Sequence, residues 1–539
     1  MADLLTIGAQ ATQLYKTALT TVSNNIANLN TEGYSRQSLD ISANPPIKIG
    51  GTYLGSGSTL NQVTRAYNGF AEANLRDAGS ELMNQQPVID YGNRIIDIFG
   101  SSTSGLTSSL DRFYTASAIL GTDPASQPLR NIFLTEAEGL ASNFRALSGQ
   151  LADINIESQT DINLQISKLN SLTQQLFVVN EQLDRKISLD QQPPALLDQR
   201  DNLLRDLSEV VKIDVKERAS GGVDVRLDGA AGTIVVNQRI STTFSASFSA
   251  TDPGGTNIFA STYSTATDTS SVTGGFLGGL INFRSQILAP AIVDLDNLAV
   301  TVNTEINAIQ TTGVDLNGQR GTALFAVDPD IGGAAGFKII QTDPSKITTA
   351  GLLRITPTTA NTGTATMDYA AVPVGAATPA VTLTFNSTTT SFSDGNGGSY
   401  ALGLNGQFDY GGISFTVAGD PANGDSFVIG LNTNSTGDNR NIQLMTQLQN
   451  KSVMANGNSI GASYAAIVSG AGNRVSLALV SQDALQAIYD QASETKASVS
   501  GVSLDEEAAD LIRFQQAFQA SAQIIQTASK LFDSILAVR

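Results

Sequence analysis

Three consecutive acidic residues, Asp505, Glu506 and Glu507, form the densest group of chemically active side chains in the sequence. Clustered carboxylates are the ligands that hard cations prefer, and they can also act as general acids or bases. These three, however, follow Ser503 and open a long segment with helical apolar spacing. Ser503 and Glu506 have capping-box spacing, and acids are stabilised near the positive end of a helix dipole. We therefore interpret the triplet as the start of a helix and not as a metal or acid–base site.

A second acidic group, Asp198, Asp201 and Asp206, is interleaved with Arg200 and Arg205. Opposite charges three to four residues apart on a helix form ion pairs at its surface. We therefore expect a solvated helix face here.

Two stretches rich in Asp and Gly, 394–398 and 421–425, have the composition of a calcium-binding loop. They lack the ligand spacing of a real loop site, so we predict ordinary turns. The glycine pairs of GGFLGG at 274–279 do not lie between a strand and the start of a helix, so no phosphate-binding loop is predicted.

Missing residue types narrow the chemistry further. The 539 residues include no Cys and no His, which excludes disulfides, thiol catalysis and the common His-based triads and zinc sites. We therefore predict no catalytic residue, no cofactor and no metal. A net charge of −18 argues against nucleic acid and anionic membranes as partners. We see no apolar run that approaches the length of a bilayer span, and no secretory signal at the N-terminal end.

The two ends of the chain are the elements that would position any functional side chains. Residues 502–539 carry a large apolar residue at every seventh position, and a second row of small or apolar residues runs beside it. This spacing predicts a long amphipathic helix with a coiled-coil seam. The seam residues that we expect at an assembly interface are Leu504, Leu511, Phe518, Ala522, Ile525, Phe532 and Leu536.

The N-terminal segment, 3–28, carries a matching seam. Its expected interface residues are Leu4, Ile7, Ala11, Leu14, Ala18, Val22 and Ile26. Two arrangements are open: the terminal helices pair and close one domain, or their seams also face neighbouring subunits. Asp3 and Glu32 balance Lys16 and Arg36 near this end, so self-repulsion would not oppose stacking of many copies. Because a lone seam helix cannot bury its face, we expect the termini to be mobile in the free chain and to become ordered on assembly.

The string SNNIANLNTEGYSRQ at 23–37 is the most specific one in the chain. Asn side chains can bond back to the free carbonyls of a helix end, and a glycine permits a sharp turn before an extended segment. Asn28, Gly33 and Tyr34 are therefore the expected site residues, either in a polar helix end or in contacts across an assembly.

This string resembles the N-terminal signature of the bacterial flagellar axial proteins, which comprise rod, hook and hook-associated proteins. The segment GVSLDEEAADLIRFQQAFQASAQIIQTASKLFDSIL at 501–536 resembles their C-terminal signature. Within that group, the sequences of both ends resemble those of the hook-associated protein 1 family.

The resemblance implies a non-enzymatic structural component of the bacterial flagellum, a junction protein that connects the hook to the filament by packing its terminal helices. The implied partners are further copies of the chain in a ring or tube, the flagellar hook protein, hook-associated protein 3, and an export chaperone on the C-terminal helix. Neither nucleic acid nor membrane is an implied partner. The implied location is extracellular, in the flagellum, after type III export without a cleaved signal peptide.

The middle of the chain indicates a mainly α fold with inserted β structure. We expect a terminal coiled-coil assembly domain formed by residues 1–36 plus 503–539. A long helical bundle would follow, formed by 37–320 plus 437–502 with a small β meander at 211–248. An outer all-β domain, 321–436, would be nested as an insertion.

Several details within the bundle can also be predicted. We expect a helix that is interrupted at Pro87. Asp123 and Pro124 open the longest helical stretch. Its apolar stripe over 140–183 shifts by one position, which predicts a long, slightly unwound antiparallel helix pair. Residues 251–274 read as a loop, and a helix over 276–310 should be kinked at Pro290.

Two other functions stay open at this point. Another axial protein, such as flagellin or hook protein, would share the terminal seams. A secreted glycan-binding or carboxylate-based hydrolytic protein would act through the 321–436 insert, since a pair of carboxylates needs neither His nor Cys.

Overall fold

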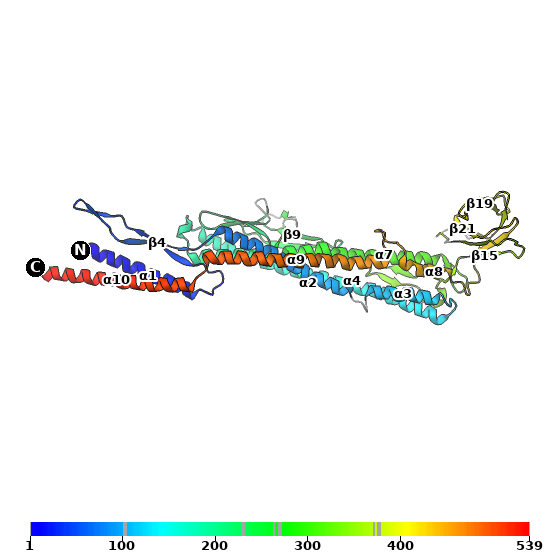
Figure 1. Ribbon diagram of the computed structural model, residues 1–539, viewed down its shortest axis with the longest axis horizontal. Helices are drawn as coiled ribbons and strands as arrows, with labels where there is room; N and C mark the ends of the chain where they lie inside the picture. The colour runs from blue at the N-terminus through cyan, green and yellow to red at the C-terminus, as the bar shows by residue number, and fades with distance from the viewer. Residues whose placement is uncertain are drawn as a thin grey trace. The chain divides into compact units, whose positions relative to one another are not determined.

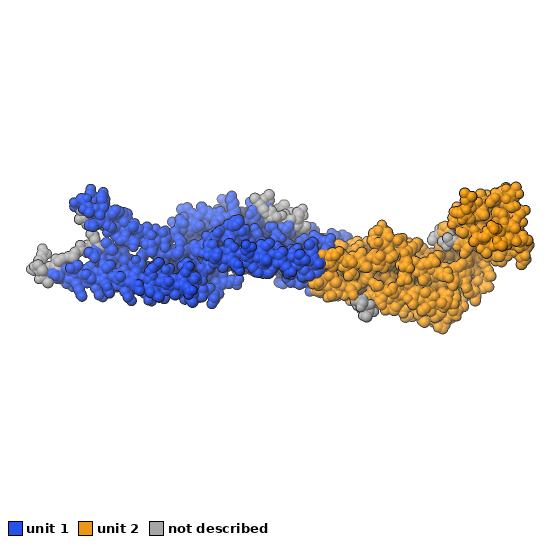
Figure 2. Space-filling model, viewed as in Figure 1, with its two compact units in different colours: residues 1–91, 156–286, 474–539 blue, residues 92–155, 287–473 orange. Residues whose placement is uncertain are grey.

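The structure is a computed structural model that describes residues 2–100, 105–227, 232–261, 265–267, 272–369, 372–373 and 379–537. The chain divides into two compact units, which Figure 2 shows in different colours. Unit 1 comprises Met1–Tyr91, Ile156–Gln286 and Arg474–Arg539, and unit 2 comprises Gly92–Asn155 and Ile287–Asn473.

The prediction of a mainly helical chain with long terminal helices and a β-rich region is confirmed (Figure 1). The helices are α1 (Ala2–Ala27), α2 (Gly69–Gly100), α3 (Leu106–Leu120), α4 (Gln127–Leu183), α5 (Pro194–Val210), α6 (Gly275–Phe283), α7 (Ala289–Thr311), α8 (Arg440–Gln447), α9 (Ile460–Ser500) and α10 (Leu504–Ala537).

Helix α4 is one unbroken helix of 57 residues, so the predicted long helical stretch is confirmed, and its antiparallel pairing with another helix stays a prediction. The apolar residues before and after the shift, such as Phe144 and Ile166, are all buried. A stutter changes the phase of the apolar stripe but removes no backbone hydrogen bond, so the helix can continue through it.

Helix α2 likewise continues through Pro87, and the predicted interruption is wrong. A proline inside a helix removes one hydrogen bond and crowds the preceding turn. Leu82 and Ile89, on either side of Pro87, are buried, so packing offsets this cost.

Among the described residues of unit 1, the strands form four small antiparallel sheets. They are the ribbon β1 (Gln37–Ala43) with β4 (Ser58–Arg65), the hairpin β2 (Ile47–Ile49) with β3 (Thr52–Leu54), the meander β5 (Ile213–Glu217), β6 (Val223–Leu227) and β7 (Ile234–Val236), and the sheet β10 (Thr265–Thr267), β9 (Thr256–Ala260) and β8 (Phe244–Phe248).

The β meander predicted at 211–248 is confirmed for β5, β6 and β7 only, because β8 pairs with β9 in a different sheet. The predicted loop at 251–274 is wrong where β9 and β10 form. Its parts at 262–264 and 268–271 lie outside the described residues. In β9, every second residue is buried, namely Thr256, Ile258 and Ala260. The sequence does not reveal this alternation, because Thr and Asn are polar.

Helices α6 and α7 are joined by a π-helix, Arg284–Leu288, which lies directly before Pro290 where the kink was predicted. The whole stretch Gly275–Thr311 is long and apolar enough, by length and composition alone, to cross a membrane. The expectation that no apolar run approaches that length is therefore wrong. Half of the most apolar part of this stretch is buried within the chain, as in the core helix of a folded domain, so the stretch is weak evidence for a membrane span.

The β-rich region lies in unit 2, between residues 313 and 431. Two short pairs come first, β11 (Gly313–Val314) with β14 (Ala350–Gly351) and β12 (Phe325–Val327) with β13 (Phe337–Ile339). A five-stranded sheet has the order β15 (Leu353–Pro357), β22 (Ser426–Leu431), β17 (Val381–Asn386), β18 (Ser391–Ser393) and β19 (Ser399–Ala401). A three-stranded sheet has the order β16 (Thr366–Tyr369), β21 (Ile413–Ala418) and β20 (Gln407–Tyr410).

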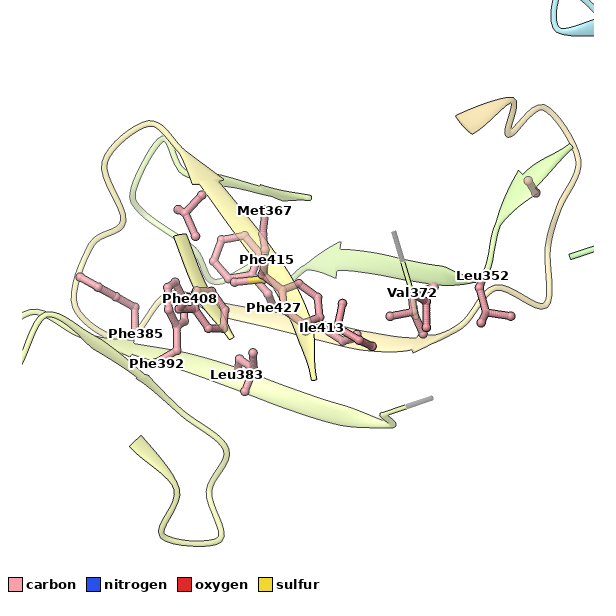
Figure 3. Packing of buried hydrophobic residues seen from close by; sticks show 14 of the residues in the cluster. Leu352, Met367, Val372, Leu383, Phe385, Phe392, Phe408, Ile413, Phe415 and Phe427 are labelled. Atoms are coloured by element: carbon pink, nitrogen blue, oxygen red, sulfur yellow. The ribbon is translucent and has the colours of Figure 1, made fainter. Parts of the chain in front are cut away.

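Aromatic side chains form the core between these two sheets (Figure 3). Phe392 of β18 stacks on Phe408 of β20, with ring centroids 4.8 Å apart, and Phe408 stacks on Phe415 of β21 at 5.5 Å. Because Phe392 belongs to one sheet and Phe408 to the other, these contacts join the two sheets face to face.

Candidate assembly interface

The terminal helices pack along each other within the chain, and Figure 1 shows α1 in blue beside α10 in red. The rings of Tyr15 and Phe514 lie 6.3 Å apart. At Gly8 the approach is so close that an added Cβ would lie 2.8 Å from Ile525 Cγ1. Residues near the start of α1 contact residues near the end of α10, so the two helices are antiparallel. The predicted pairing of the two ends is confirmed.

The predicted interface residues of α1 differ in exposure. Leu14, Ala18 and Val22 are buried. Ile7, Ala11 and Ile26 are partly buried, and Leu4 is exposed. The seam of α1 is therefore best covered near its C-terminal end.

The predicted interface residues of α10 are less covered. Leu511, Phe518, Ala522 and Ile525 are partly buried, and Leu504 and Phe532 are 52% and 56% exposed. The side chain of Leu536 lies outside the described residues.

A different row of α10 is the most buried one. Glu507, Ser521 and Ala528 are buried, and Phe514, at the same spacing of seven, contacts Tyr15. The sequence prediction chose the row with the largest apolar residues and missed this one. The signal that could have found it is the small size of Ser521 and Ala528, since small residues allow two helices to approach closely. We call the row that contains Leu504, Phe518 and Phe532 the outward row of α10.

A buried amide, Asn25, joins the end of α1 to the start of α10. Its Nδ2 donates to Glu507 Oε2 at 3.0 Å and to the Gln37 carbonyl at 2.9 Å. Its Oδ1 accepts from the Gln37 N–H at 3.0 Å and from the Tyr34 hydroxyl at 2.7 Å. Asn25 and Glu507 are each only 1% exposed, so these bonds satisfy polar groups that water does not reach.

Arg36 compensates the buried charge of Glu507. Its Nε lies 2.7 Å from Glu507 Oε1, and a second guanidinium nitrogen lies 2.8 Å from Glu506 Oε2. Burial lowers the pKa of Arg36, but its hydrogen bond and charge interaction with Glu507 outweigh burial and raise the pKa. The Arg36 N–H also donates to the Ser500 carbonyl at 2.9 Å.

The acidic triplet therefore does more than begin a helix. Helix α10 begins at Leu504, as the sequence predicts. Glu507, however, is a buried ion-pair partner that fixes this helix to the N-terminal end of the chain. No sequence signal connects Asn25 and Arg36 to Glu507, because Glu507 lies 482 and 471 residues further along the chain. We call these three residues the polar junction.

A second buried ionic group supports the polar junction from α5. The Ser35 N–H donates to Asp198 Oδ2 at 3.1 Å. Arg65 of β4 lies 2.9 Å from Asp198 and 2.7 Å from Asp201. Arg200 pairs with Asp201 at 2.7 Å. The prediction of a solvated helix face is therefore wrong for these α5 residues, because Arg65 comes from a distant strand that periodicity cannot reveal.

The Asn-rich string is a polar helix end, one of its two predicted forms. Asn28 Nδ2 donates to the Asn24 carbonyl at 2.9 Å, and this carbonyl also accepts from the Asn28 N–H at 3.1 Å, so the side chain reinforces the last turn of α1. Gly33 has φ +77°, and an added Cβ would collide with the Asn202 side chain. Burial, followed by the nearby charge of Asp198, raises the pKa of Tyr34 to about 12. Whether these residues also contact other subunits stays a prediction.

The other acidic stretches form turns in the structure. Asp394 accepts from the N–H groups of Asn396 and Gly398, both at 2.9 Å. Asp425 accepts from the Ala422 N–H at 2.8 Å and the Thr362 N–H at 2.8 Å. Within the described ranges, no three acidic side chains gather where they could hold a metal ion.

Comparison with known proteins covers the whole chain. The family described as Flagella basal body rod protein matches residues 5–34, and Flagellar basal body rod FlgEFG protein C-terminal matches 497–538. Flagellar hook-associated protein FlgK helical domain matches 93–325.

Full-length relatives carry the name Flagellar hook-associated protein 1. The proteins of Salmonella typhimurium (strain LT2) and Escherichia coli (strain K12) are 27% and 28% identical, with all of both chains covered. The protein of Bacillus subtilis (strain 168) is 23% identical over 98% of this chain and 96% of its own.

A solved structure shows the same fold. It is the flagellar hook junction protein FlgK from Burkholderia pseudomallei, with a TM-score of 0.70 and 22% identity over 79% of this chain and 100% of that one. The matches to both ends and to the helical middle agree with one another and with the full-length relatives. Over its full length the chain is therefore similar to proteins named Flagellar hook-associated protein 1, and its middle matches the FlgK helical domain.

Proposed function

We propose that the chain is a structural subunit of the bacterial flagellum that joins the hook to the filament. Many copies would pack their terminal helices into a ring or tube. The observation that carries this proposal is the outward row of α10. Pairing with α1 leaves the large apolar residues Leu504 and Phe532 of this row exposed and Phe518 only partly buried.

The energetics favour further packing of this row. Each Å² of apolar surface removed from water contributes about 25 cal/mol, and fully burying a Phe or Leu side chain contributes about 1.5–3 kcal/mol. Within one copy, α1 covers the neighbouring row and part of this one, at Ile525, but leaves Leu504 and Phe532 exposed. Neighbouring copies can provide the missing burial, and the ordering entropy of the helices would be offset at that step.

The partners follow from the same proposal. The flagellar hook protein would lie on one side of the ring and hook-associated protein 3 on the other. An export chaperone would cover α10 before export, because a free outward row would promote aggregation. The site of action would be extracellular, in the flagellum, after export through the flagellar secretion channel.

The domain organisation that we propose assigns assembly to 1–36 plus 503–539. The helical bundle, 37–320 plus 437–502, would hold the ends in place. The β-rich segment 321–436 would be an inserted domain on the outside.

We also propose that the chain is not an enzyme. Two backbone N–H groups lower the pKa of Asp394. Burial raises the pKa of Asp425, but three backbone N–H groups outweigh burial and lower it. A glycosidase needs a carboxylic acid whose pKa is raised. These two carboxylates of the β-rich region are shifted in the opposite direction, which weighs against the hydrolase alternative.

Substitution of Phe518 by Asp tests the proposed function. A charge in the outward row would have to be buried on assembly, so Phe518→Asp should abolish incorporation into flagella while the rest of the chain stays folded. Gln519→Asp is the matched control, because it adds the same charge at an exposed neighbouring position. Motility and filament retention in the bacterium that encodes the chain are the readouts, and circular dichroism checks the fold. Functional flagella with Phe518→Asp would contradict the proposal.

A further inference from the structure

The hairpin formed by β2 and β3 carries exposed apolar side chains near the N-terminal end. Gly50 and Gly51 form its turn with φ values of +60° and +103°. Tyr53 is 67% exposed, and Ile47 and Leu54 are also exposed. An isolated two-stranded hairpin is only marginally stable in water, so exposed apolar residues at its tip favour contact with another surface.

The tip of the hairpin, residues 45–56, extends beyond a bond that holds its base to α1. At its base, Asn44 Nδ2 donates to Gln10 Oε1 of α1 at 3.2 Å. Between residues 45 and 56, no hydrogen bond or ion pair to α2 or α9 occurs among the described residues. In Figure 1 the ribbon follows α1 and its tip extends free of the helices.

A groove of matching character lies elsewhere in the same unit, between α2 and α9. Its volume is about 440 Å³, and its apolar lining includes Ala71, Ala78, Leu485 and Ile488. The groove forms because small alanines of α2 face α9. Ile488, although apolar, is exposed there.

Charge distinguishes the two surfaces. Asp77 and Glu81 line the groove. Glu81 pairs with Lys212 at 2.7 Å, whereas Asp77 forms no ion pair within the described part of the chain. Burial raises the pKa of Asp77, and the nearby charges of Arg76 and Lys212 do not offset this rise. Lys48, the cation of the hairpin tip, lies 5.7 Å from the Tyr53 ring centroid and is exposed.

We propose that the hairpin tip of one copy docks in the α2–α9 groove of the next copy. Lys48 would lie against Asp77, and Tyr53 would cover Leu485 and Ile488. The tip and the groove are different surfaces, so the contact is heterologous and generates a ring or a helical array rather than a closed dimer. The inference rests on the proposed function only in requiring neighbouring copies.

Site-specific cross-linking tests this contact, because the chain has no Cys of its own. Thr52→Cys at the tip and Gln491→Cys at the groove rim leave the proposed contact residues in place. The two variants carry different tags and are produced together in the bacterium that encodes the chain. A bismaleimide reagent applied to isolated flagella should give a product that contains both tags. Thr52→Cys with Leu404→Cys, an exposed position in the β-rich region, should give none.

Charge exchange sharpens the test. Lys48→Glu should lower the yield of the doubly tagged product about fivefold, and adding Asp77→Lys should restore it. The same cross-linking is done with the purified chain at high concentration. Absence of the chain from flagella would contradict the proposed function, whereas lack of the product both in flagella that contain the chain and in the purified chain would overturn the docking proposal.

Discussion

The β-rich region and the terminal helix pair use their apolar residues in opposite ways. In the β-rich region the side chains of Leu383, Phe392 and Phe415 are fully buried between two sheets. In the terminal pair, large apolar residues such as Leu504 and Phe532 stay exposed although a partner helix is present. The β-rich region therefore completes its core within one chain, and the terminal pair does not.

This difference separates stability from assembly. A buried aromatic cluster contributes mainly to the free energy of unfolding of the region that contains it. An exposed row contributes little to the fold of one chain and becomes effective only when a neighbour covers it. The polar junction has a third role, because it fixes the incomplete pair in one arrangement without adding apolar burial.

Phe392→Ala should have the largest effect on stability. Removing a fully buried Phe costs about 3–5 kcal/mol through lost burial and the cavity left behind. We expect this loss in the β-rich region, measured by urea unfolding with hydrogen exchange resolved by segment. Incorporation into flagella should persist at low temperature.

Leu404→Ala is the matched control, because Leu404 lies in the same region but is exposed. Its effect should stay within about 0.5 kcal/mol. Equal losses from the two substitutions would contradict the assignment of the aromatic cluster as the core of this region.

Glu507→Ala should have an intermediate effect, restricted to the terminal pair. The change removes two bonds to Arg36 and Asn25 and leaves the buried amide without one partner. Loss of hydrogen bonds to a charged group costs about 2 kcal/mol. Faster hydrogen exchange in α1 and α10, with no change in the β-rich region, is the expected result.

Glu506→Ala serves as the control for Glu507→Ala. Glu506 also pairs with Arg36, but its side chain is exposed, and such pairs contribute about 0–1 kcal/mol. If both variants opened the terminal helices equally, the polar junction would not depend on the buried carboxylate.

The sequence predicts elements well where one period dominates. The seam of α1 and the start of α10 at Leu504 follow from apolar spacing and from acids at a helix N-terminus. Short runs in which apolar and polar residues alternate are sufficient to predict where the β-rich region lies in the sequence. The sequence prediction fails at Pro87, because tertiary burial decides whether a helix continues through a local defect.

The candidate site is predicted less completely. The sequence indicates that the terminal helices pair, but it cannot tell which of two rows spaced by seven faces the partner. Large apolar residues favour the first row as the predicted contact with α1. The close approach of the helices at Gly8 instead favours small residues such as Ser521 and Ala528. The ion pairs of Glu507 and Asp198 depend on Arg36 and Arg65, and only three-dimensional structure brings these residues together.

Tyr34 gives the smallest effect, which appears only at high pH. Its pKa is raised from the ordinary value of 10.0 to about 12, because burial and the charge of Asp198 disfavour the phenolate. The folded state thus retains the proton, and the contribution to stability is complete below pH 10 and is lost as the pH rises through about 12. Thermal unfolding of the terminal helices should show this fall in stability between those pH values. Tyr34→Phe should be less stable at neutral pH, because Asn25 loses a hydrogen-bond donor. The variant should not show the fall in stability at high pH. A fall of the same size in Tyr34→Phe would show that another group titrates there, and the polar junction would then not depend on the protonated phenol.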